Sequence, residues 1–461
     1  MNRAMLAAVA FFLMFAPPAS ALRAAERPNV IVIVGDDMGY RDIGVHGCKD
    51  IPTPHIDSLA KNGIRCTNGY VSGPYCSPTR AGLLTGRYQQ RFGHEFNPGP
   101  PGDANIDIGL PLSETTLAQV LKDAGYATGM VGKWHLGHDT KFHPLSRGFE
   151  EYFGFLGGAH SYFNDADGKG KKGGGAGSVM RGREPIAEKE YLTDAFAREA
   201  VAYIDRKSKA KDKPFFLYLT FNAVHTPMHA TGGRLKEFAS IQNEKRRTYA
   251  AMMSAMDDAV GAVLKKLGDS GLQKNTLIFF VSDNGGPQPA NASDNGELHG
   301  NKATTWEGGV RVPFLVQWPA RLPAGKTYDH PVIQLDFFPT ILAAAGIEAT
   351  LKNKLDGTNL LPHLDGTNPQ PPHNALYWRF GQQMAIRVGD WKLTKARDGG
   401  GLFNLATDIG ERKDLGAEQP DKFKELTAAY EAWNKELREP LWGAGAAARA
   451  RGKNKDKGNG N

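Results

Sequence analysis

The sequence predicts an α/β protein: a mostly parallel sheet covered by helices on both faces, followed by a small antiparallel sheet with one packed helix. Runs of β-branched and aromatic residues alternate with helical stretches along most of the chain. Such continuous apolar runs are typical of strands buried on both faces of a parallel sheet. After about residue 373 the pattern changes to short strands separated by turns. A chain of 461 residues is long enough for a large core and more than one unit.

Each element is predicted from local signals. Thr53, followed by Pro54 and ending at Gly63, has the capping pattern of a helix. The amphipathic run over residues 249–268 predicts a long helix that packs on the sheet. The predicted strands cover residues 30–34, 127–131, 215–225, 276–284 and 310–318. The other predicted helices cover residues 77–86, 113–125, 333–346 and, on the C-terminal sheet, 421–437.

The chain divides into four predicted segments. Residues 1–21 have an early arginine, a short apolar stretch and small residues at the end, which is the pattern of a cleaved secretory signal. The main α/β domain is expected over residues 26–372 and the small C-terminal sheet over residues 373–440. Residues 441–461 are basic, lack apolar periodicity and are predicted to be disordered. We therefore expect a periplasmic or secreted protein without stable membrane insertion.

Charge and cysteine content narrow the class of protein. The net charge is +7, but the C-terminal tail holds five basic residues against one acidic residue. The rest of the chain offers no broad basic face, so no nucleic-acid partner is predicted. Three cysteines exclude a disulfide framework. Cys48 and Cys66 could pair in an oxidising compartment or could both be small buried residues, and the sequence leaves both alternatives open.

Reactive polar residues follow four of the predicted strands. In chain order they are Asp36 and Asp37, Lys133 and His135, His225, and Asp283 with Asn284. Ligands of open parallel sheets bind beyond the carboxyl ends of the strands. We therefore expect these side chains to converge on one edge of the sheet and to form a single site.

The acidic residues of this set predict a metal site. Asp36, Asp37, Asp283 and Asn284 offer hard oxygen ligands, which suit Ca²⁺ or Mg²⁺. Zinc would call for sulfur or several imidazoles. A single Asp-Asp pair is more often a helix cap or a turn. Two polar pairs at equivalent strand ends make a metal the better interpretation.

Cys76 lies at the start of a predicted helix and has polar neighbours, so we expect it to be exposed for chemistry. Free N–H groups and the helix dipole favour an anion at such a position. Arg80, one turn further, would point its guanidinium the same way. Together they predict a site for a tetrahedral oxyanion ester. The alternative is a capping turn with a buried thiol.

The stretch from Cys76 to Arg80, CSPTR, matches the C-x-P-x-R signature of type I (formylglycine-dependent) sulfatases. Four further stretches resemble blocks of that family: NVIVIVGDDMGYRDIG, GKWHLG, SDNGG and NKATTWEGGVRVP. They stand in the family's order between about Asn29 and Leu437, and their details are most similar to the arylsulfatase and N-acetylgalactosamine-6-sulfatase branch. The resemblance implies an alkaline-phosphatase-like fold and a sulfuric ester hydrolase.

The resemblance also implies the cofactors. A formylglycine-generating maturation enzyme would oxidise Cys76 to Cα-formylglycine, and one oxygen of the hydrated aldehyde would attack sulfur. Asp36, Asp37, Asp283 and Asn284, together with residue 76, would hold Ca²⁺, with Mg²⁺ less favoured. Asp283 would accept the proton of the nucleophile.

The remaining catalytic roles are implied in the same way. Arg80 and Lys133 would steady the diol oxygens. His135 would be the base that deprotonates the remaining hydroxyl and expels sulfate. His225 and Lys302 would donate to sulfate and protonate the leaving alcohol, since an alkoxide is a poor leaving group.

Two further residues are predicted to bind substrate. Ser161, in GGAHSYF, resembles a position where the family has a further sulfate contact. The sequence departs from the family there, with His160 before the serine, and His160 could itself recognise substrate. The Gly/Lys-rich stretch over residues 167–183 is predicted to be a mobile surface loop, with a substrate lid as the alternative.

The function implied is removal of sulfate from a sulfated carbohydrate. A phosphonate monoester or phosphodiester hydrolase would share the metal site and the cysteine signature. A non-catalytic binder of sulfated glycans is a third alternative, which the intact signature at Cys76 argues against. The sequence does not predict the sugar, the sulfate position, exo or endo action, or the oligomeric state. Loops that recognise substrate vary freely on a fixed scaffold.

Overall fold

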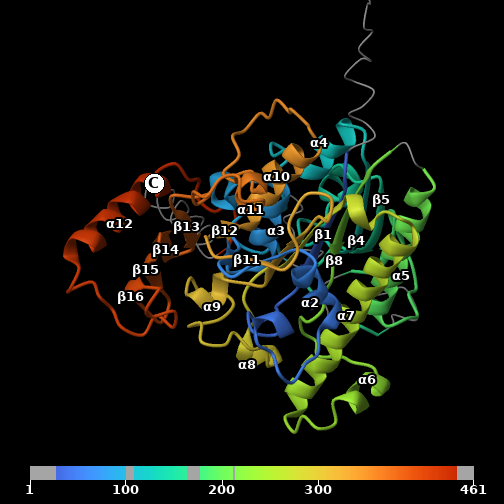
Figure 1. Cartoon of the computed structure of the whole chain (residues 1–461), viewed down its shortest axis with the longest axis horizontal. Helices are drawn as coiled ribbons and strands as arrows, with labels where there is room; N and C mark the ends of the chain where they lie inside the picture. Colours follow the sequence, from blue (N-terminus) through green and yellow to red (C-terminus); the bar gives the residue numbers. More distant parts are fainter. Residues whose placement is uncertain (1–26, 100–107, 164–176, 211–212, 444–461) are drawn as a thin grey trace, which may run out of the picture.

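The computed structural model describes most of the chain (Figure 1). The predicted signal segment and nearly all of the predicted tail lie outside the described residues, as do residues 167–176 of the Gly/Lys-rich stretch. The described ranges are 27–99, 108–163, 177–210 and 213–443. Within them a ten-stranded mixed sheet and a separate four-stranded antiparallel sheet confirm the predicted fold class.

Five parallel strands form the centre of the large sheet. They are β1 (Asn29–Gly35), β4 (Ala127–Lys133), β5 (Glu151–Phe155), β8 (Phe215–Thr220) and β9 (Thr276–Ser282). Side chains alternate across β1: Ile31 and Ile33 enter one apolar layer, and Val32 enters the other. Both faces of the strand are therefore buried, which explains why its sequence is continuously apolar instead of alternating.

Short strands complete the two edges of this sheet. They are β2 (Ile64–Cys66), β6 (Met180–Arg181), β7 (Glu184–Pro185), β10 (Phe314–Gln317) and β11 (Lys326–Tyr328). The order is β11-β2-β10-β9-β1-β8-β4-β5-β6-β7. The predicted strand β10 runs antiparallel to β9 and β2. Met180 and Arg181, which were expected in a loop, instead pair with β5.

Helices cover both faces of the sheet. One layer consists of α2 (Pro54–Lys61), α5 (Leu192–Ser208) and α7 (Glu244–Asp269), and the other of α3 (Cys76–Thr85), α4 (Leu117–Asp123) and α10 (Phe337–Ala344). α5 is not among the predicted helices, although Leu192, Phe196 and Ala200 recur at helical spacing and are buried. Shorter elements are α6 (Gly232–Glu237), α8 (Gln288–Asn291), α9 (Glu307–Val310), α11 (Leu361–Leu364), the pair β3 (Gly69–Tyr70) and β12 (Val332–Ile333), and 3-10 turns at Gly44–His46, Gln89–Phe92, Thr140–Phe142, Pro144–Ser146, Gln273–Asn275 and Gln334–Asp336.

Several predicted boundaries differ from the structure, among them those of α4 and β8. α4 begins at Leu117 because Thr116 and Gln119 form a reciprocal capping box, with the Gln119 N–H donating to the Thr116 hydroxyl at 3.2 Å. β8 ends at Thr220, so His225 lies on the loop beyond the strand and not at its end.

Within the described residues, no helix combines the length and apolarity needed to cross a bilayer.

The C-terminal sheet consists of four antiparallel strands, β13 (Leu376–Phe380), β14 (Gln383–Val388), β15 (Trp391–Ala396) and β16 (Gly399–Asn404), followed by α12 (Pro420–Asn434). Trp378 and Ile386 of the sheet and Leu426 of the helix share one apolar cluster. In Figure 1 this unit, in red, lies at the opposite end of the molecule from α5. The buried Lys392 joins it to the main body through an ion pair of 2.9 Å to Glu307, and Glu411 of the same unit pairs with Lys392 at 2.8 Å.

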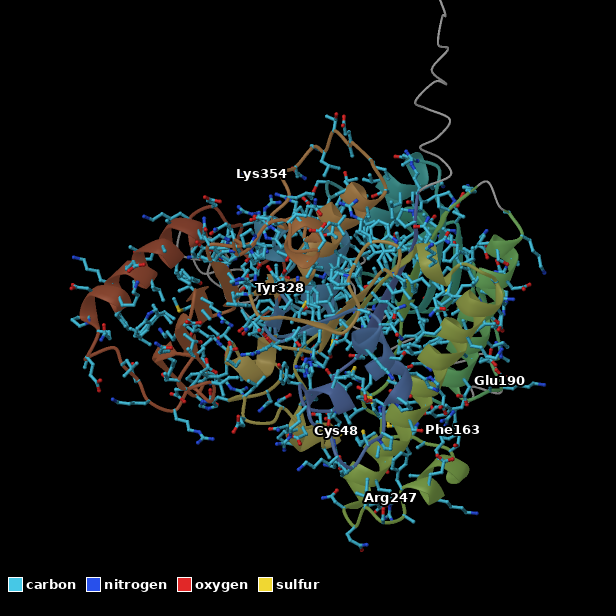
Figure 2. The ribbon with its side chains drawn as sticks, in the orientation of Figure 1. Cys48, Phe163, Glu190, Arg247, Tyr328 and Lys354 are labelled. Carbon is cyan, nitrogen blue, oxygen red and sulfur yellow. The ribbon has the colours of Figure 1, made fainter. Side chains whose placement is uncertain are left out.

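The described chain also settles the state of two cysteines. Cys48 and Cys66 are free thiols, so they do not pair in this structure. Cys66 is buried in β2. Cys48 is partly exposed, and its position is marked in Figure 2.

A buried ion pair lies where the C-terminal unit begins. His373 Nε2 is 2.9 and 3.0 Å from the two carboxylate oxygens of Asp336. The carboxylate also accepts backbone N–H groups from Ile333 and Thr358 at 2.9 and 2.8 Å. Burial alone would lower the pKa of His373, but the charge of Asp336 raises it above its ordinary value.

We predict that His373→Asn lowers the free energy of unfolding by about 1.5–3 kcal/mol at pH 6, the cost of removing a charged hydrogen bond. A histidine with a raised pKa contributes its full stabilisation below the unfolded pKa and loses it as the pH rises through the folded pKa. The loss should therefore shrink at pH 9. Urea unfolding at the two pH values measures it, with His330→Asn on the surface as control. An equal loss at both pH values would contradict the assignment.

Candidate functional site

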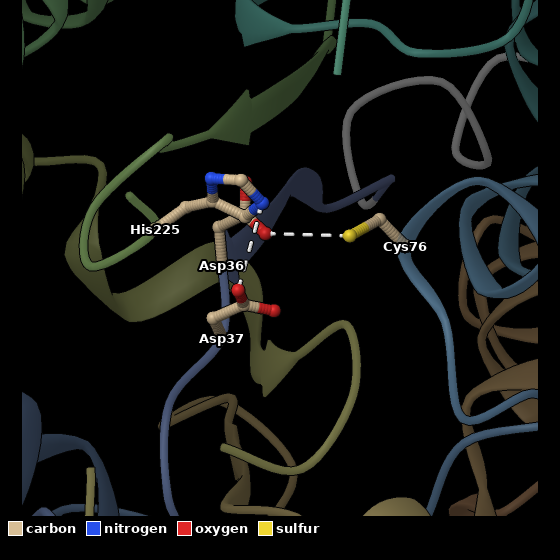
Figure 3. Close-up of side chains that lie close together, drawn as sticks. All are labelled: Asp36, Asp37, Cys76 and His225. Atoms are coloured by element: carbon tan, nitrogen blue, oxygen red, sulfur yellow. Dashed lines mark hydrogen bonds and ion pairs between the residues drawn. The ribbon is translucent and has the colours of Figure 1, made fainter. Parts of the chain in front are cut away.

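The candidate site lies at the carboxyl edge of the large sheet. Asp36 and Asp37 directly follow β1, Lys133 is the last residue of β4, and Asp283 follows β9. Cys76 faces them from the first position of α3. Figure 3 shows Asp36, Asp37 and Cys76 converging with His225, and ligand atoms of these four side chains all lie within 4.8 Å of one another. Strand ends far apart in the sequence thus meet at one point, as parallel topology requires.

A buried charge network surrounds Asp36. Lys133 Nζ is 2.5 Å from its carboxylate, and Arg80 Nη2 is 3.8 Å away. Arg80 also donates to Asp283 Oδ2 through Nη2 at 2.8 Å and Nε at 3.0 Å. All four side chains are fully buried. Each carboxylate here needs a cation beside it, because an unpaired buried charge costs several kcal/mol.

Lys302 and His225 approach Asp37 from the open side of the site. Lys302 Nζ is 2.7 Å from Asp37 Oδ1 and 3.2 Å from Cys76 Sγ. His225 Nε2 is 3.6 Å from Asp37 Oδ2. Two basic groups therefore stand next to position 76, where a negatively charged ligand would be bound.

The thiol of Cys76 is 1% exposed, so the expectation of an exposed cysteine is wrong. Every residue of α3 is buried, since the helix packs between the sheet and α10. Burial raises the pKa of the Cys76 thiol to about 12 despite the nearby lysines. At neutral pH this sulfur is a protonated thiol and a weak nucleophile.

Charges within the site shift the pKa values of its other ionisable groups, some upward and some downward. Burial would raise the pKa of Asp36, but Lys133, His225 and Arg80 hold it well below its ordinary value. Burial would lower the pKa of Lys302, but Asp37 raises it well above. His135 has its pKa lowered by burial and by the neighbouring cations. The site therefore combines charged lysine with neutral imidazole at the same pH.

His135 is held in an unusual backbone conformation. Its φ is 60°, in the left-handed region that few side-chain-bearing residues adopt. Its carbonyl accepts a hydrogen bond from Ser77 Oγ at 2.6 Å. A Cβ at Gly158 would lie 2.6 Å from its Nε2, so the ring packs directly against backbone. Strain of this kind is typical of functional positions.

The donor set fits a hard divalent cation. Asn284 Nδ2 donates to Asp37 Oδ1 at 2.7 Å, whereas Asn284 Oδ1 is buried without a hydrogen-bond partner in the described structure. A buried amide oxygen without a partner is costly unless an ion or water occupies it. Together with the carboxylates at the neighbouring strand ends, those of Asp36, Asp37 and Asp283, this oxygen matches the ligand types of Ca²⁺ or Mg²⁺.

Ser161 and His160 lie on a segment that touches the site on both sides, with Gly158 against His135 and Tyr162 bonded to the His225 carbonyl. Both lie on the chain beyond β5, and Ser161 Oγ donates to the Phe163 carbonyl at 2.8 Å and lies 3.5 Å from His229 Nδ1. They line a small pocket that also includes Phe163 and Glu190, which Figure 2 marks on the same flank of the molecule. Among the described contacts, Ser161 lies next to His229, and its role in binding sulfate stays a prediction.

Two supporting contacts were not predicted. Ser77 donates its hydroxyl to the His135 carbonyl at 2.6 Å, and Tyr162 donates its hydroxyl to the His225 carbonyl at 2.8 Å. Ser77 lies within the CSPTR stretch, so its position is visible in the sequence although its partner is not. The contact of Tyr162 spans 63 residues and has no sequence signal.

Comparison with known proteins agrees with this geometry. The Sulfatase family model matches residues 28–347, and a model for the C-terminal region of N-sulphoglucosamine sulphohydrolase matches residues 298–434. N-acetylgalactosamine-6-sulfatase of Rattus norvegicus is 36% identical over 391 residues, covering 80% of this chain and 71% of the relative. Arylsulfatase J of Mus musculus is 31% identical, covering 91% and 77%. The crystal structure of Ps i-CgsB in complex with k-i-k-neocarrahexaose is 38% identical, with a TM-score of 0.85, and covers 90% of this chain and 94% of that chain.

An α/β fold with acidic, basic and cysteine side chains at the carboxyl edge of its sheet is the framework of a hydrolase of charged esters. The chain belongs to the sulfatase family, and it is a sulfuric ester hydrolase. The predicted resemblance to the arylsulfatase and N-acetylgalactosamine-6-sulfatase branch is confirmed.

We predict that Ca²⁺ raises the melting temperature of the protein, because a cation that binds only the folded state stabilises it by about 2.7 kcal/mol at one hundred times its Kd. Asn284→Ala removes the partnerless oxygen and should weaken this response. Differential scanning fluorimetry over a Ca²⁺ titration measures the shift, with the exposed Asn62→Ala as control. Equal responses of wild type and Asn284→Ala would show that the ion is not held here.

Proposed function

We propose that this protein removes sulfate from a sulfated carbohydrate, using a formylglycine derived from Cys76 and a bound Ca²⁺. The observation that carries the proposal is the position of Cys76 Sγ, 3.2 Å from Lys302 Nζ and 3.7 Å from Asp36 Oδ1. A nucleophile at this atom would attack sulfur between the metal ligands and the lysine. The names of similar proteins, an N-acetylgalactosamine-6-sulfatase and a protein in complex with neocarrahexaose, support a carbohydrate substrate.

The thiol itself does not suit this chemistry, because burial keeps it protonated. Oxidation to an aldehyde supplies a hydrate oxygen where Sγ now lies. Since Cys76 is buried in the folded chain, a maturation enzyme would have to act before α3 packs. Export by the N-terminal segment to the periplasm or the exterior belongs to the same proposal.

The charged residues would bind and orient the sulfate group. When bound, Ca²⁺ supplies charge that stabilises the sulfate oxygens, and Mg²⁺ is the less favoured alternative. Arg80 and Lys133, which are already paired with Asp283 and Asp36, hold positive charge beside residue 76. Fixed cations in a dry site stabilise charge that spreads over the sulfuryl oxygens in the transition state.

Proton transfer would fall to the residues whose pKa values are shifted apart. His135, with its lowered pKa, is neutral and can accept a proton from the residue-76 oxygen. Lys302, with its raised pKa, is charged and can donate toward the leaving oxygen. His225 is positioned beside Asp37 for the same task. Asp283 would take the proton of the attacking hydroxyl.

We predict that Cys76→Ala lowers sulfate release on the order of 10³-fold or more, since it removes the nucleophile. Sulfate release is measured by ion chromatography over a panel of sulfated sugars and 4-nitrophenyl sulfate, with an aryl phosphonate included. Intact mass must first confirm the aldehyde at residue 76. Cys48→Ala is the matched control and should retain activity. A faster reaction on the phosphonate than on every sulfate would favour the phosphonate hydrolase instead.

We predict that His135→Ala slows turnover of 4-nitrophenyl sulfate by roughly 10²–10⁴-fold, the usual contribution of a positioned base. His138→Ala is the control, because its Nε2 lies 3.1 Å from the Gly99 carbonyl and not against the site. Steady-state kinetics measures the turnover of 4-nitrophenyl sulfate by both variants and by wild type, each loaded with the same amount of metal. Near-normal turnover by His135→Ala would show that His135 is not the catalytic base.

A further inference from the structure

The C-terminal sheet contacts the loop that carries Lys302. The residue after Lys302, Ala303, donates its N–H to the Pro74 carbonyl at 2.8 Å. Its own carbonyl accepts a hydrogen bond from Gln383 Nε2 at 2.9 Å. Pro74 lies two residues before Cys76, and Gln383 begins β14. Ala303 is thus held between the loop of the nucleophile and the C-terminal sheet.

Ala303 needs such contacts because its backbone is strained. Its φ is 68°, in the left-handed region, and a residue with a Cβ stays there only when its surroundings hold it. The oxygen of the Gln383 side-chain amide is also bonded, because Gln383 Oε1 accepts the Arg397 N–H at 3.2 Å. This second hydrogen bond fixes the orientation of the amide. Its NH₂ group is therefore directed at the Ala303 carbonyl.

Further contacts bind the same loop to the same sheet. Thr305 Oγ1 lies 3.0 Å from Thr394 Oγ1, and Trp306 Nε1 donates to Asp398 Oδ1 at 2.9 Å. These contacts lie three and four residues beyond Lys302. The hydrogen bond from Gln383 is closer to Lys302 along the chain and is made at the strained residue.

We infer that Gln383 is a positioning residue: it fixes the backbone at Ala303 so that Lys302 Nζ reaches both Asp37 and residue 76. This inference rests on the proposed function of Lys302 as a donor to sulfate and to the leaving oxygen. The C-terminal sheet then forms part of the catalytic machinery. Displacements of about 1 Å at a reacting group can cost roughly 10²-fold in rate.

The test compares two substrates that differ in their need for an acid. A 4-nitrophenolate leaves readily without a proton, whereas an alkoxide does not. With formylglycine verified in each protein, Gln383→Ala should lose roughly 10- to 100-fold in kcat/KM on an alkyl sulfate, and on 4-nitrophenyl sulfate only the several-fold that weaker sulfate binding causes. Gln382→Ala, the exposed neighbour, should keep both activities.

Gln383→Glu retains the acceptor for Arg397 and loses the donor to Ala303, so it should show the same selective loss. Equal losses on both substrates, or none, in variants that melt like wild type would overturn the inference. Lower melting with equal losses would also overturn it, because that pattern marks general destabilisation.

Calorimetry with inorganic sulfate supplies a reading that does not depend on turnover. Because Lys302 would contact sulfate, Gln383→Ala should bind it several-fold more weakly than wild type does. Unchanged affinity would contradict the inference. If the matured wild type hydrolyses no sulfate ester, the proposed function fails, and the sulfate affinities of the two proteins still decide the role of Gln383.

Discussion

The site depends on neutralising two fully buried carboxylates, those of Asp36 and Asp283. They are stabilised by Lys133 and Arg80 at 2.5 and 2.8 Å. Without these cations the carboxylates would take up protons or force the site open. Asn284 Oδ1 has no partner in the described structure and is available for a metal ion. The charge balance that stabilises the fold is therefore also what prepares the site for a sulfate ester.

The parallel sheet explains how these charges come together. The central strands end at the same edge, so β1, β4 and β9 bring Asp36, Lys133 and Asp283 to the site without a long loop. α3 meets this edge with its N-terminus, which places Cys76 opposite Asp36. Catalytic groups set on strand ends and a buried helix are held rigidly, as preorganised catalysis requires.

The small C-terminal sheet has a part in this arrangement. It contacts the Lys302 loop through Gln383 and joins the main body through the buried Lys392. An otherwise separate four-stranded unit thereby supports one wall of the site. This explains why the loop can hold Ala303 in a strained conformation: hydrogen bonds reach it from both sides.

The sequence by itself determined the fold class and led to the residues proposed as metal ligands and nucleophile, because strand ends and the CSPTR stretch are local patterns and parallel topology brings strand ends together. It also identified Lys302 and His225 through family resemblance. Only the tertiary structure decided that Cys76 is buried and that Gln383 reaches the Lys302 loop. Burial and contacts across eighty or more residues depend on how layers pack, and no local pattern encodes them.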